Sequence, residues 1–457
     1  GVITDINGDF QINEKDIIDK RLIISFIGFQ TDTVTIKEKN DTDLIITLKN
    51  VTNLDLVVVK ENLDGILIDK SNPIKTEIIT QKELTKAACC DLAGCFETQI
   101  SVDSKTTNII TNTKELSILG LSGVYNQVLI DGFPVVNGAN YTYGISAVPG
   151  TLIENIYISQ GLASVIQGPE SITGQINILL KEKSENESIF INLYCNSFLE
   201  KQANMDYNFN LGKWKSIASF HATQPAKKWD SNSDNFLDLP QTKKYSFYNK
   251  WVYGLENNTN FYSSITVRYL NEKRIGGQID FDEQNDQGSN SIYGQIISFS
   301  QPELYSKSSY KLNDNHSIIM QAALSYHDQE SFFGSTKYVT NQLTQFINVS
   351  HKLNWNNHKL TSGFDFRKLK LKEDINSENV SIINPLSYYG EHLKNEKIPG
   401  FFIENNFNWE NKSTQLITGM RIDHHNDHGL FFTPRMLMKY NFSENTIVRL
   451  SLGTGWK

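Results

Sequence analysis

The sequence lacks the long apolar runs that a helical membrane protein needs. No stretch of 18 consecutive apolar residues occurs among its 457 residues, and the mean hydropathy is −0.37. Helical membrane spans are therefore excluded, because a helix needs about 20 apolar residues to cross a bilayer. A membrane barrel is still compatible with the sequence, since its strands are only alternately apolar.

The sequence also has no excess of positive charge. Its 43 lysines and arginines are outnumbered by 51 aspartates and glutamates, which gives a net charge of −8. A nucleic-acid-binding chain usually carries a basic patch, so we expect no nucleic-acid partner. Motifs of catalysis are missing too: no Gly-rich phosphate loop, no G-x-S-x-G elbow and no H-E-x-x-H. We expect neither enzymatic activity nor a cofactor.

Cysteine is scarce, with four residues: Cys89, Cys90, Cys95 and Cys195. Their spacing does not give the two well-separated ligand pairs of a structural zinc site. Two interpretations stay open. The thiols are buried or free, as unbridged cysteines often are, or Cys95 is bridged to one of the vicinal pair in an oxidising compartment.

The stretch from Ser184 to the end of the chain repeatedly alternates apolar and polar residues. Met205 and Tyr207, for example, alternate with Asp206 and Asn208. We count about thirteen such runs by the period-two rule. Many of them reach the length of about nine to eleven residues that a tilted strand needs to cross a bilayer. The pattern is typical of a transmembrane β-barrel, although a soluble β-sandwich alternates in the same way with shorter strands.

The most informative stretch is Leu121–Leu180. Gln127–Ile130 is a short β-prone run, Asp131-Gly132 is a turn dipeptide, and Ile153–Ser159 alternates like a half-buried strand. The motifs LIDG-P, VPGTLIENI, GLASVIQGPESITG and GQINI follow in this order. With these motifs the stretch closely resembles the plug domain of TonB-dependent outer-membrane receptors.

The resemblance implies a mainly β protein with three folded parts and a linker. Residues 1–49 resemble the carboxypeptidase-regulatory-like β-sandwich module that precedes the plug in Bacteroidetes receptors. A linker (50–70), an α+β plug (71–183) and an antiparallel transmembrane β-barrel (184–457) would follow. Such barrels close with about 22 strands, so we expect only about the first half here, and a fragment that lacks residues at both ends.

Shorter elements are also predicted before and within the plug. In the first module we expect strands that include Leu22–Phe26 and Thr33–Ile36. Thr80 and Glu83 have the capping-box spacing of a helix start. Further short strands are predicted at Ile109–Ile110 and Leu116–Leu119.

The linker contains a compact β-prone run, Leu56, Val57, Val58 and Val59. Its position before the plug predicts the TonB box, the extended peptide that the energising partner TonB captures. Strand addition suits this role, because main-chain hydrogen bonds supply the grip without a preformed pocket. The alternative is a linker strand that packs on the first module.

By the resemblance, two plug loops face the extracellular cavity and would bind the ligand. The predicted ligand-binding residues are Ser122, Gly123, Tyr125, Asn126, Asn137, Tyr141 and Tyr143. Tyrosine suits this role as a rigid ring with a polar tip, but these rings would alternatively pack against the barrel wall. Asp131, Gly132 and Pro134 are predicted to form a structural turn, with a positive φ at the glycine. Many ferric-siderophore receptors carry an arginine where this chain has Leu119, which argues against an anionic chelate.

Three of the nine histidines, His424, His425 and His428, lie within five residues. With neighbouring aspartates they are weak candidates for a transition-metal site, and a solvated loop is the alternative. By the resemblance, Asp423–Phe432 is an extracellular loop and Asn441–Asn445 a periplasmic turn. The polar spans 232–239 and 276–290 also predict outward-facing loops.

Together these patterns predict active, TonB-dependent transport of a ferric siderophore or another metal chelate across the outer membrane. Cobalamin or an oligosaccharide is the alternative cargo. A secreted β-rich adhesin or glycan-binding protein is the alternative from a different class. The expected partners are TonB, the lipid of the outer membrane and the ligand.

Overall fold

The chain folds into two compact units in the computed structural model, Gly1–Asn62 and Leu63–Lys457. The described residues are 21–24, 32–35, 66–69, 73–86, 92, 94–96, 99, 101–144, 148–184, 187–254, 260–289, 291–377, 389–409, 414–443 and 446–457. In the first unit, β1 (Arg21–Ile24) pairs antiparallel with β2 (Asp32–Thr35); the two strands overlap the two predicted runs, and each begins one residue earlier. The proposed TonB box, Leu56–Val59, and the pair Cys89-Cys90 lie outside the described residues.

The second unit begins with the plug, whose core is a five-stranded sheet in the order β3-β4-β8-β9-β7. Its strands are β3 (Ile66–Ile68), β4 (Thr76–Thr80), β7 (Asn126–Ile130), β8 (Ile153–Gln160) and β9 (Gly174–Leu180). Strands β7 and β9 run parallel, and all of their residues are buried. Burial on both faces favours apolar side chains such as Val128 and Ile130. Polar residues also lie in these strands, and Gln175 donates to the side-chain oxygen of Gln127 at 2.7 Å.

Short helices and one hairpin complete the plug. Helix α1 (Gln81–Lys86) begins directly after Thr80, as the capping-box spacing predicts. The remaining elements are the hairpin β5 (Asp103–Asn108) and β6 (Thr113–Ser117), helix α2 (Asn140–Gly144), and the 3-10 turns η2 (Gly94–Phe96), η3 (Gly123–Tyr125), η4 (Gly150–Leu152) and η5 (Val165–Gln167). Among the cysteines, Cys95 is buried in η2 and Cys195 is exposed.

The prediction of a strand at Ile109–Ile110 is wrong, because these residues form the turn of the β5–β6 hairpin. The side chain of Asn108 accepts hydrogen bonds from the backbone N–H groups of Ile110 (3.0 Å) and Thr111 (3.4 Å). Such local bonds from an asparagine favour a turn over a strand. The strand predicted at Leu116–Leu119 ends at Ser117.

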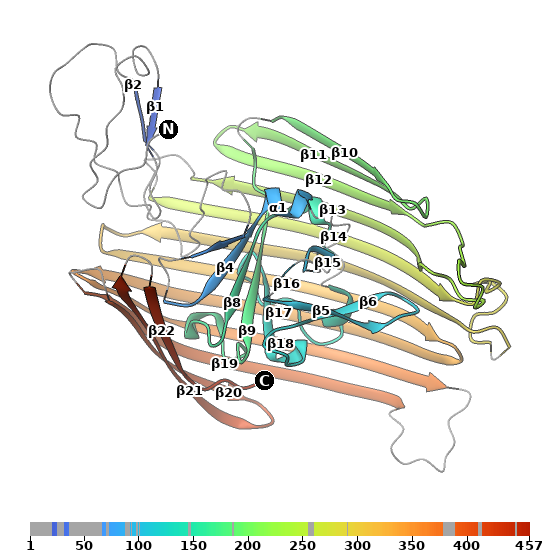
Figure 1. Ribbon diagram of the computed structural model, residues 1–457. Coiled ribbons are helices and arrows are strands. Elements are labelled where there is room, and N and C mark those ends of the chain that lie inside the picture. The colour runs from blue at the N-terminus through green and yellow to red at the C-terminus, as the bar shows by residue number, and fades with distance from the viewer. Residues whose placement is uncertain are drawn as a thin grey trace. The chain divides into compact units, whose positions relative to one another are not determined.

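Thirteen antiparallel strands, β10 to β22, form one sheet in which each strand pairs with its neighbours in sequence. This confirms the predicted number of strand-like runs. Figure 1 shows the sheet curving around the plug, which lies on its concave side. The strands are β10 (Ile189–Cys195), β11 (Lys201–Leu211), β12 (Trp214–Gln224), β13 (Gln241–Tyr253), β14 (Phe261–Gly277), β15 (Gly294–Lys311), β16 (His316–Phe333), β17 (Thr336–Trp355), β18 (His358–Ser377), β19 (Gly390–Asn408), β20 (Thr414–His425), β21 (Gly429–Ser443) and β22 (Thr446–Gly453).

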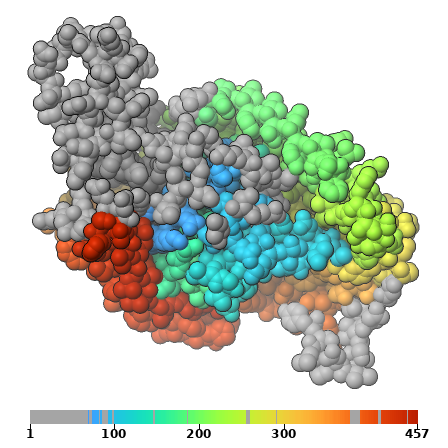
Figure 2. Space-filling model, viewed as in Figure 1, coloured from blue at the N-terminus to red at the C-terminus, as the bar shows by residue number. Residues whose placement is uncertain are grey.

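The burial pattern of the sheet is the reverse of that in a water-soluble protein. On β11, the apolar Met205 and Tyr207 are 41% and 44% exposed on the convex face. The polar Asp206 and Asn208, which point to the concave face, are 3% and 8% exposed. The plug covers part of this polar concave face, while Figure 2 shows plug residues near 110 (cyan) at the open side between the two sheet edges.

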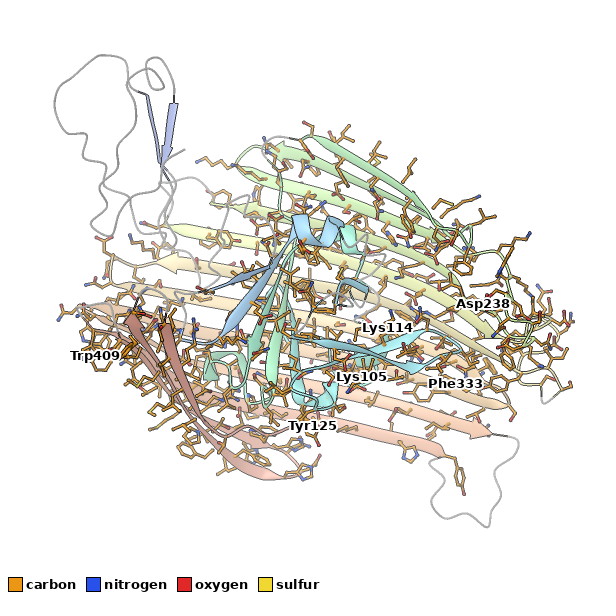
Figure 3. All side chains as sticks on the ribbon, in the orientation of Figure 1. Lys105, Lys114, Tyr125, Asp238, Phe333 and Trp409 are labelled. Carbon is orange, nitrogen blue, oxygen red and sulfur yellow. The ribbon has the colours of Figure 1, made fainter. Side chains whose placement is uncertain are left out.

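The two ends of the sheet differ in the length of their connections. Residues 225–240 and 278–293 join strands at one end, called the long-loop end; the two-residue turn 212–213 lies at the opposite, short-turn end. Figure 3 shows Asp238 and Phe333 at the first end and Trp409 at the second. Most of the predicted loops 232–239 and 276–290 fall within the two long connections.

The prediction of a ten-residue loop at Asp423–Phe432 is wrong. Strand β20 continues to His425 and β21 begins at Gly429, so only three residues form the turn. Asp423 pairs with Phe431 across the two strands, and the φ of +80° at Gly429 allows the tight reversal. The predicted turn at Asn441–Asn445 also begins too early, because β21 extends to Ser443.

Among the described residues, no helix is long and apolar enough to span a membrane.

Candidate functional site

The Asp131-Gly132 turn docks the plug onto the concave face of the sheet. Asp131 and Gly132 have φ values of +50° and +82°, which confirms the predicted positive φ at the glycine. One carboxylate oxygen of Asp131 accepts a hydrogen bond from the N–H of Leu180 at 2.9 Å. The other lies 3.2 Å from Nζ of Lys250 on β13. The turn is thus tied both to the plug's own sheet and to the surrounding strands.

The residues after this turn continue the same contact. The ring of Phe133 stacks on that of Tyr305 on β15, with 5.1 Å between centroids and 16° between planes. Pro134 is buried beside it. Stacked aromatic pairs contribute about 0.5–1.5 kcal/mol beyond the area that they bury. These contacts place the turn in the packing between the plug and the sheet.

The second predicted ligand loop, which contains α2, is held by a side chain of the sheet. Gln342 on β17 donates from Nε2 to the carbonyl oxygen of Asn137 at 3.0 Å and accepts from the N–H of Ala139 at 2.7 Å. Within the loop, Asn140 accepts a hydrogen bond from the N–H of Asn137 at 2.7 Å. The polar groups of this loop are therefore largely used in holding it.

The two tyrosines of the second loop point into the protein. Tyr143 is 6% exposed, and its ring lies 5.9 Å from that of Phe299 on β15. Burial raises the pKa of its hydroxyl to about 12. Tyr141 is half-buried; its hydroxyl lies so close to Gly123 that any side chain at Gly123 would collide with it. Both rings thus lie where the alternative, packing against the barrel wall, would place them.

The first predicted ligand loop, Ser122–Asn126, and Leu119 just before it present apolar side chains to solvent. Leu119 adopts a φ of +55° and is 66% exposed. Tyr125, at the end of η3, is 45% exposed. The carboxylate of Glu115 accepts hydrogen bonds from the hydroxyl of Ser122 (2.6 Å) and from the N–H of Gly123. The loop is thus fixed from behind while its apolar side chains stay accessible.

The structure separates the seven predicted ligand residues into two groups. Ser122 and Tyr125 are exposed on the first loop, and Figure 3 shows Tyr125 at the lower edge of the plug. The five others are half-buried or buried: Gly123, Asn126, Asn137, Tyr141 and Tyr143. Asn126, for example, donates to the carbonyl oxygen of Leu116 at 2.8 Å.

Sequence reasoning missed a set of charged residues that hold the plug segment around η5. Arg435 on β21 donates to the carbonyl oxygens of Ala163 and Pro169, both at 2.8 Å. Glu404 on β19 accepts from the hydroxyl of Ser164 at 2.7 Å. The available signal was the alternation of the strands, which placed these charged residues on the face opposite the apolar ones.

Two further arginines of the sheet complete this contact. Arg421 is fully buried, donates to the carbonyl oxygen of Val165 in the plug at 3.4 Å, and is held by Asp365 (2.7 Å) and Asp423 (2.5 Å). Arg367 donates to the carbonyl oxygen of Gln167 at 2.9 Å. Charge-assisted bonds of this kind are about twice as strong as neutral ones. They fix the plug at several points on four neighbouring strands.

Only two of the three clustered histidines, His425 and His428, come together. His424 is exposed on the convex face of β20, whereas its neighbour His425 is buried on the concave face, because successive side chains of a strand alternate. His425 lies 3.5 Å from Glu396, and its ring centroid is 4.7 Å from that of His428. The described residues contain no group of three metal-ligating side chains.

Solved structures of a transporter and of two receptors share this fold. The copper transporter OprC (TM-score 0.66, 13% identity) matches over 85% of this chain and 63% of its own. The siderophore receptor PirA from Pseudomonas aeruginosa (0.61, 16%) matches over 83% and 61%. The alcaligin receptor FauA from Bordetella pertussis (0.63, 12%) matches over 84% and 63%. The chain therefore spans about three fifths of the length of these proteins.

Two family models match the chain and together cover most of the second unit. The TonB-dependent receptor plug domain matches residues 69–175. The TonB-dependent receptor-like β-barrel matches residues 196–457, more than half of the chain. No curated protein matches the sequence. On these matches, and on the plug and sheet described above, the chain belongs to the family of TonB-dependent receptors.

Proposed function

We propose that the protein is the receptor part of a TonB-dependent system that imports a metal chelate, such as a ferric siderophore, across the outer membrane. One observation carries the proposal: a folded plug is held on the polar concave face of a sheet whose convex face is apolar. A transporter needs this combination of a polar interior and a surface that matches lipid. Members of the family are receptors and transporters, and we expect no catalysis.

The convex face also carries an aromatic band at the short-turn end. Neighbouring rings there include Trp214 and Tyr253 (5.3 Å between centroids), and Phe407 and Trp409 (4.4 Å). Aromatic girdles mark the interfaces of membrane barrels, where a ring contacts lipid and water at once. This band supports the outer membrane as the location, with the short turns on the periplasmic side and the long connections outside.

Metal chelates are the proposed cargo on two grounds. The similar structures include siderophore receptors and a copper transporter. In this chain, Tyr125 and the exposed Leu119 offer a rigid aromatic and apolar contact surface. A chelate with an apolar or neutral outer shell suits this surface better than a strongly anionic one, because no arginine stands at Leu119. Cobalamin and oligosaccharides are the alternative cargoes.

Energy coupling would use the segment that precedes the plug. We propose Leu56–Val59 as the TonB box, which TonB would pair with as an added strand. We also propose residues 1–49 as a carboxypeptidase-regulatory-like module of the Bacteroidetes type, followed by the linker (50–70), plug (71–183) and barrel (184–457). In this scheme, ligand binding outside releases the box inside, and the pull of TonB remodels the plug.

The test is uptake by the full-length receptor in an outer-membrane host that lacks its own iron-chelate receptors. Radioactive iron is supplied as a panel of ferric siderophores, with and without a protonophore that collapses the energising gradient. We expect accumulation of at least one chelate that the protonophore abolishes. If the receptor instead takes up labelled cobalamin or oligosaccharide, that compound becomes the cargo and the metal-chelate proposal is wrong. A protein that is released into buffer without detergent would support the adhesin alternative.

A further inference from the structure

The outward face of strand β18 changes character abruptly along its length. Asp365 and Arg367 point to the concave face, where Asp365 is fully buried and Arg367 contacts the plug. Because side chains alternate along a strand, the even-numbered residues of β18 point outward, to the convex face. From the short-turn end to the long-loop end these are Phe364, Phe366, Lys368, Lys370 and Lys372. Two aromatic rings are thus followed by three amines on the same face.

The neighbouring strand adds a fourth lysine at the same boundary. Lys397 on β19 is the direct cross-strand partner of Lys368 in the antiparallel register. Both side chains are on the convex face, and like charges placed opposite each other destabilise a sheet. Of these four lysines, Lys372 alone forms an ion pair with a described residue, Glu391 at 3.0 Å. We call Lys368, Lys370, Lys372 and Lys397 the outer lysine cluster.

Not every strand carries positive charge on the corresponding part of its outward face. On β16 the outward face changes after Tyr326 to Asp328 and Glu330. Glu330 pairs with Lys337 at 2.5 Å, and Asp328 accepts a hydrogen bond from the side-chain amide of Asn341. Beyond Lys372, the same outward face carries Asp374 and its cross-strand partner Glu391. Four lysines next to these two carboxylates leave a local excess of positive charge.

On the side of the cluster that faces the short-turn end, the convex surface is apolar and accessible. Phe364 pairs directly with Phe401 on β19, and the two rings are 47% and 56% exposed. This arrangement is complementary to a molecule with an anionic headgroup, which would contact the amines, and acyl chains, which would contact the neighbouring aromatic rings. A soluble phosphate would use only the amines. A lipid uses both parts, since burial of each CH₂ group contributes about 0.8 kcal/mol.

We propose that this face of β18 and β19 binds a phosphorylated lipid of the surrounding membrane. The phosphate lies between Lys368 and Lys397, and the acyl chains cover Phe364, Phe366 and Phe401. The phosphate offsets the repulsion between the paired lysines, which explains why the sheet tolerates them. This inference goes beyond cargo transport, and it rests on the outer-membrane location proposed above.

The test measures lipid retention by the full-length receptor purified in dodecyl maltoside. Diphosphoryl lipid A is the probe, and native mass spectrometry counts the bound molecules across a titration. We expect the double variant K368Q/K397Q to bind the probe at least tenfold more weakly, because each lysine near an anionic lipid contributes about fivefold. The conservative variant K368R/K397R should retain binding.

A matched control removes two lysines from the opposite end of the sheet. Lys213 lies in the turn between β11 and β12, and Lys311 ends β15 at the same short-turn end. K213Q/K311Q has the same net charge as the test variant and should bind the probe like the parent. An equal loss in both variants would show that total charge, and not this cluster, determines binding.

Two further measurements distinguish the ligand. A dephosphorylated form of the same lipid should bind weakly, and inorganic phosphate at millimolar concentration should not displace the probe. Equal binding of the dephosphorylated lipid, or displacement by phosphate, would overturn the proposal. The assay uses neither cargo nor TonB, so the lipid-binding proposal still stands if the cargo proposal fails. A protein that is soluble without detergent would contradict both proposals.

Discussion

The side-chain amide of Gln342 holds the backbone of Asn137. Its Nε2 donates to the carbonyl oxygen and to the side-chain oxygen of Asn137, each at 3.0 Å. Its oxygen accepts from the N–H of Ala139 at 2.7 Å. These residues are more than 200 positions apart in sequence, so a single side chain of β17 fixes a plug loop. Movement of this loop away from β17 requires the loss of these bonds.

Gln342→Leu should free the second plug loop. Leucine cannot form the hydrogen bonds, and buried polar groups left without partners cost about 1–3 kcal/mol each. We expect faster amide hydrogen exchange in residues 137–144 of the detergent-solubilised full-length receptor. Gln345→Leu is the control, since Gln345 points outward on the same strand. Equal exchange in both variants would show that Gln342 does not hold the loop.

Tyr125→Ala should weaken ligand binding without unfolding the plug. Loss of a central aromatic contact typically costs about 2 kcal/mol or more, which is roughly a thirtyfold loss of affinity. Equilibrium binding of the cognate chelate to the full-length receptor measures this effect. A change below about twofold would place the ligand on the barrel loops.

Tyr143→Ala is the matched comparison for Tyr125→Ala. Its ring is buried against Phe299, so truncation leaves a cavity and should lower the free energy of unfolding by roughly 3 kcal/mol. The affinity of the folded fraction for the chelate should not change. A thirtyfold loss of affinity with normal stability would instead make Tyr143 a ligand contact.

Gly132→Val should destabilise the plug through the backbone alone. The φ of +82° costs an L-residue about 1–2 kcal/mol, while no atom lies within 4 Å of the position that a Cβ would occupy. The readout is the susceptibility of the plug to limited proteolysis during heating. Gly144→Ala is the control, because the nearest atom to its added Cβ is in Val136 at 3.7 Å. Unchanged proteolysis of the Gly132 variant would contradict a structural role for the turn.

Val58→Pro should abolish uptake and leave ligand binding intact. Proline removes one backbone donor from the strand that TonB would pair with. Uptake of the radioactive chelate and binding to intact cells are measured side by side in the full-length receptor. Asn53→Pro, outside the four-residue run, should transport normally. Normal transport by the Val58 variant would rule out Leu56–Val59 as the TonB box.

Much of the architecture follows from local sequence patterns. The alternation of Met205 and Tyr207 with polar neighbours is sufficient to predict a strand with one apolar face, because side chains alternate along the chain. Asp131-Gly132 predicts a turn with positive φ, since glycine adopts it without a steric penalty. The motifs of Leu121–Leu180 indicate the plug, and the family models agree.

The tertiary structure alone decided which of these residues are accessible. Tyr125 and Tyr143 are alike in sequence context, yet one is exposed and the other is covered by Phe299, 156 positions later. The loop predicted at Asp423–Phe432 became two paired strands, because pairing with the partner strand outweighs local polarity. Arg435 and Gln342 gained their roles from contacts with plug segments about 200 or more residues away. Local patterns specify strands and turns, but burial depends on packing partners that are distant in sequence.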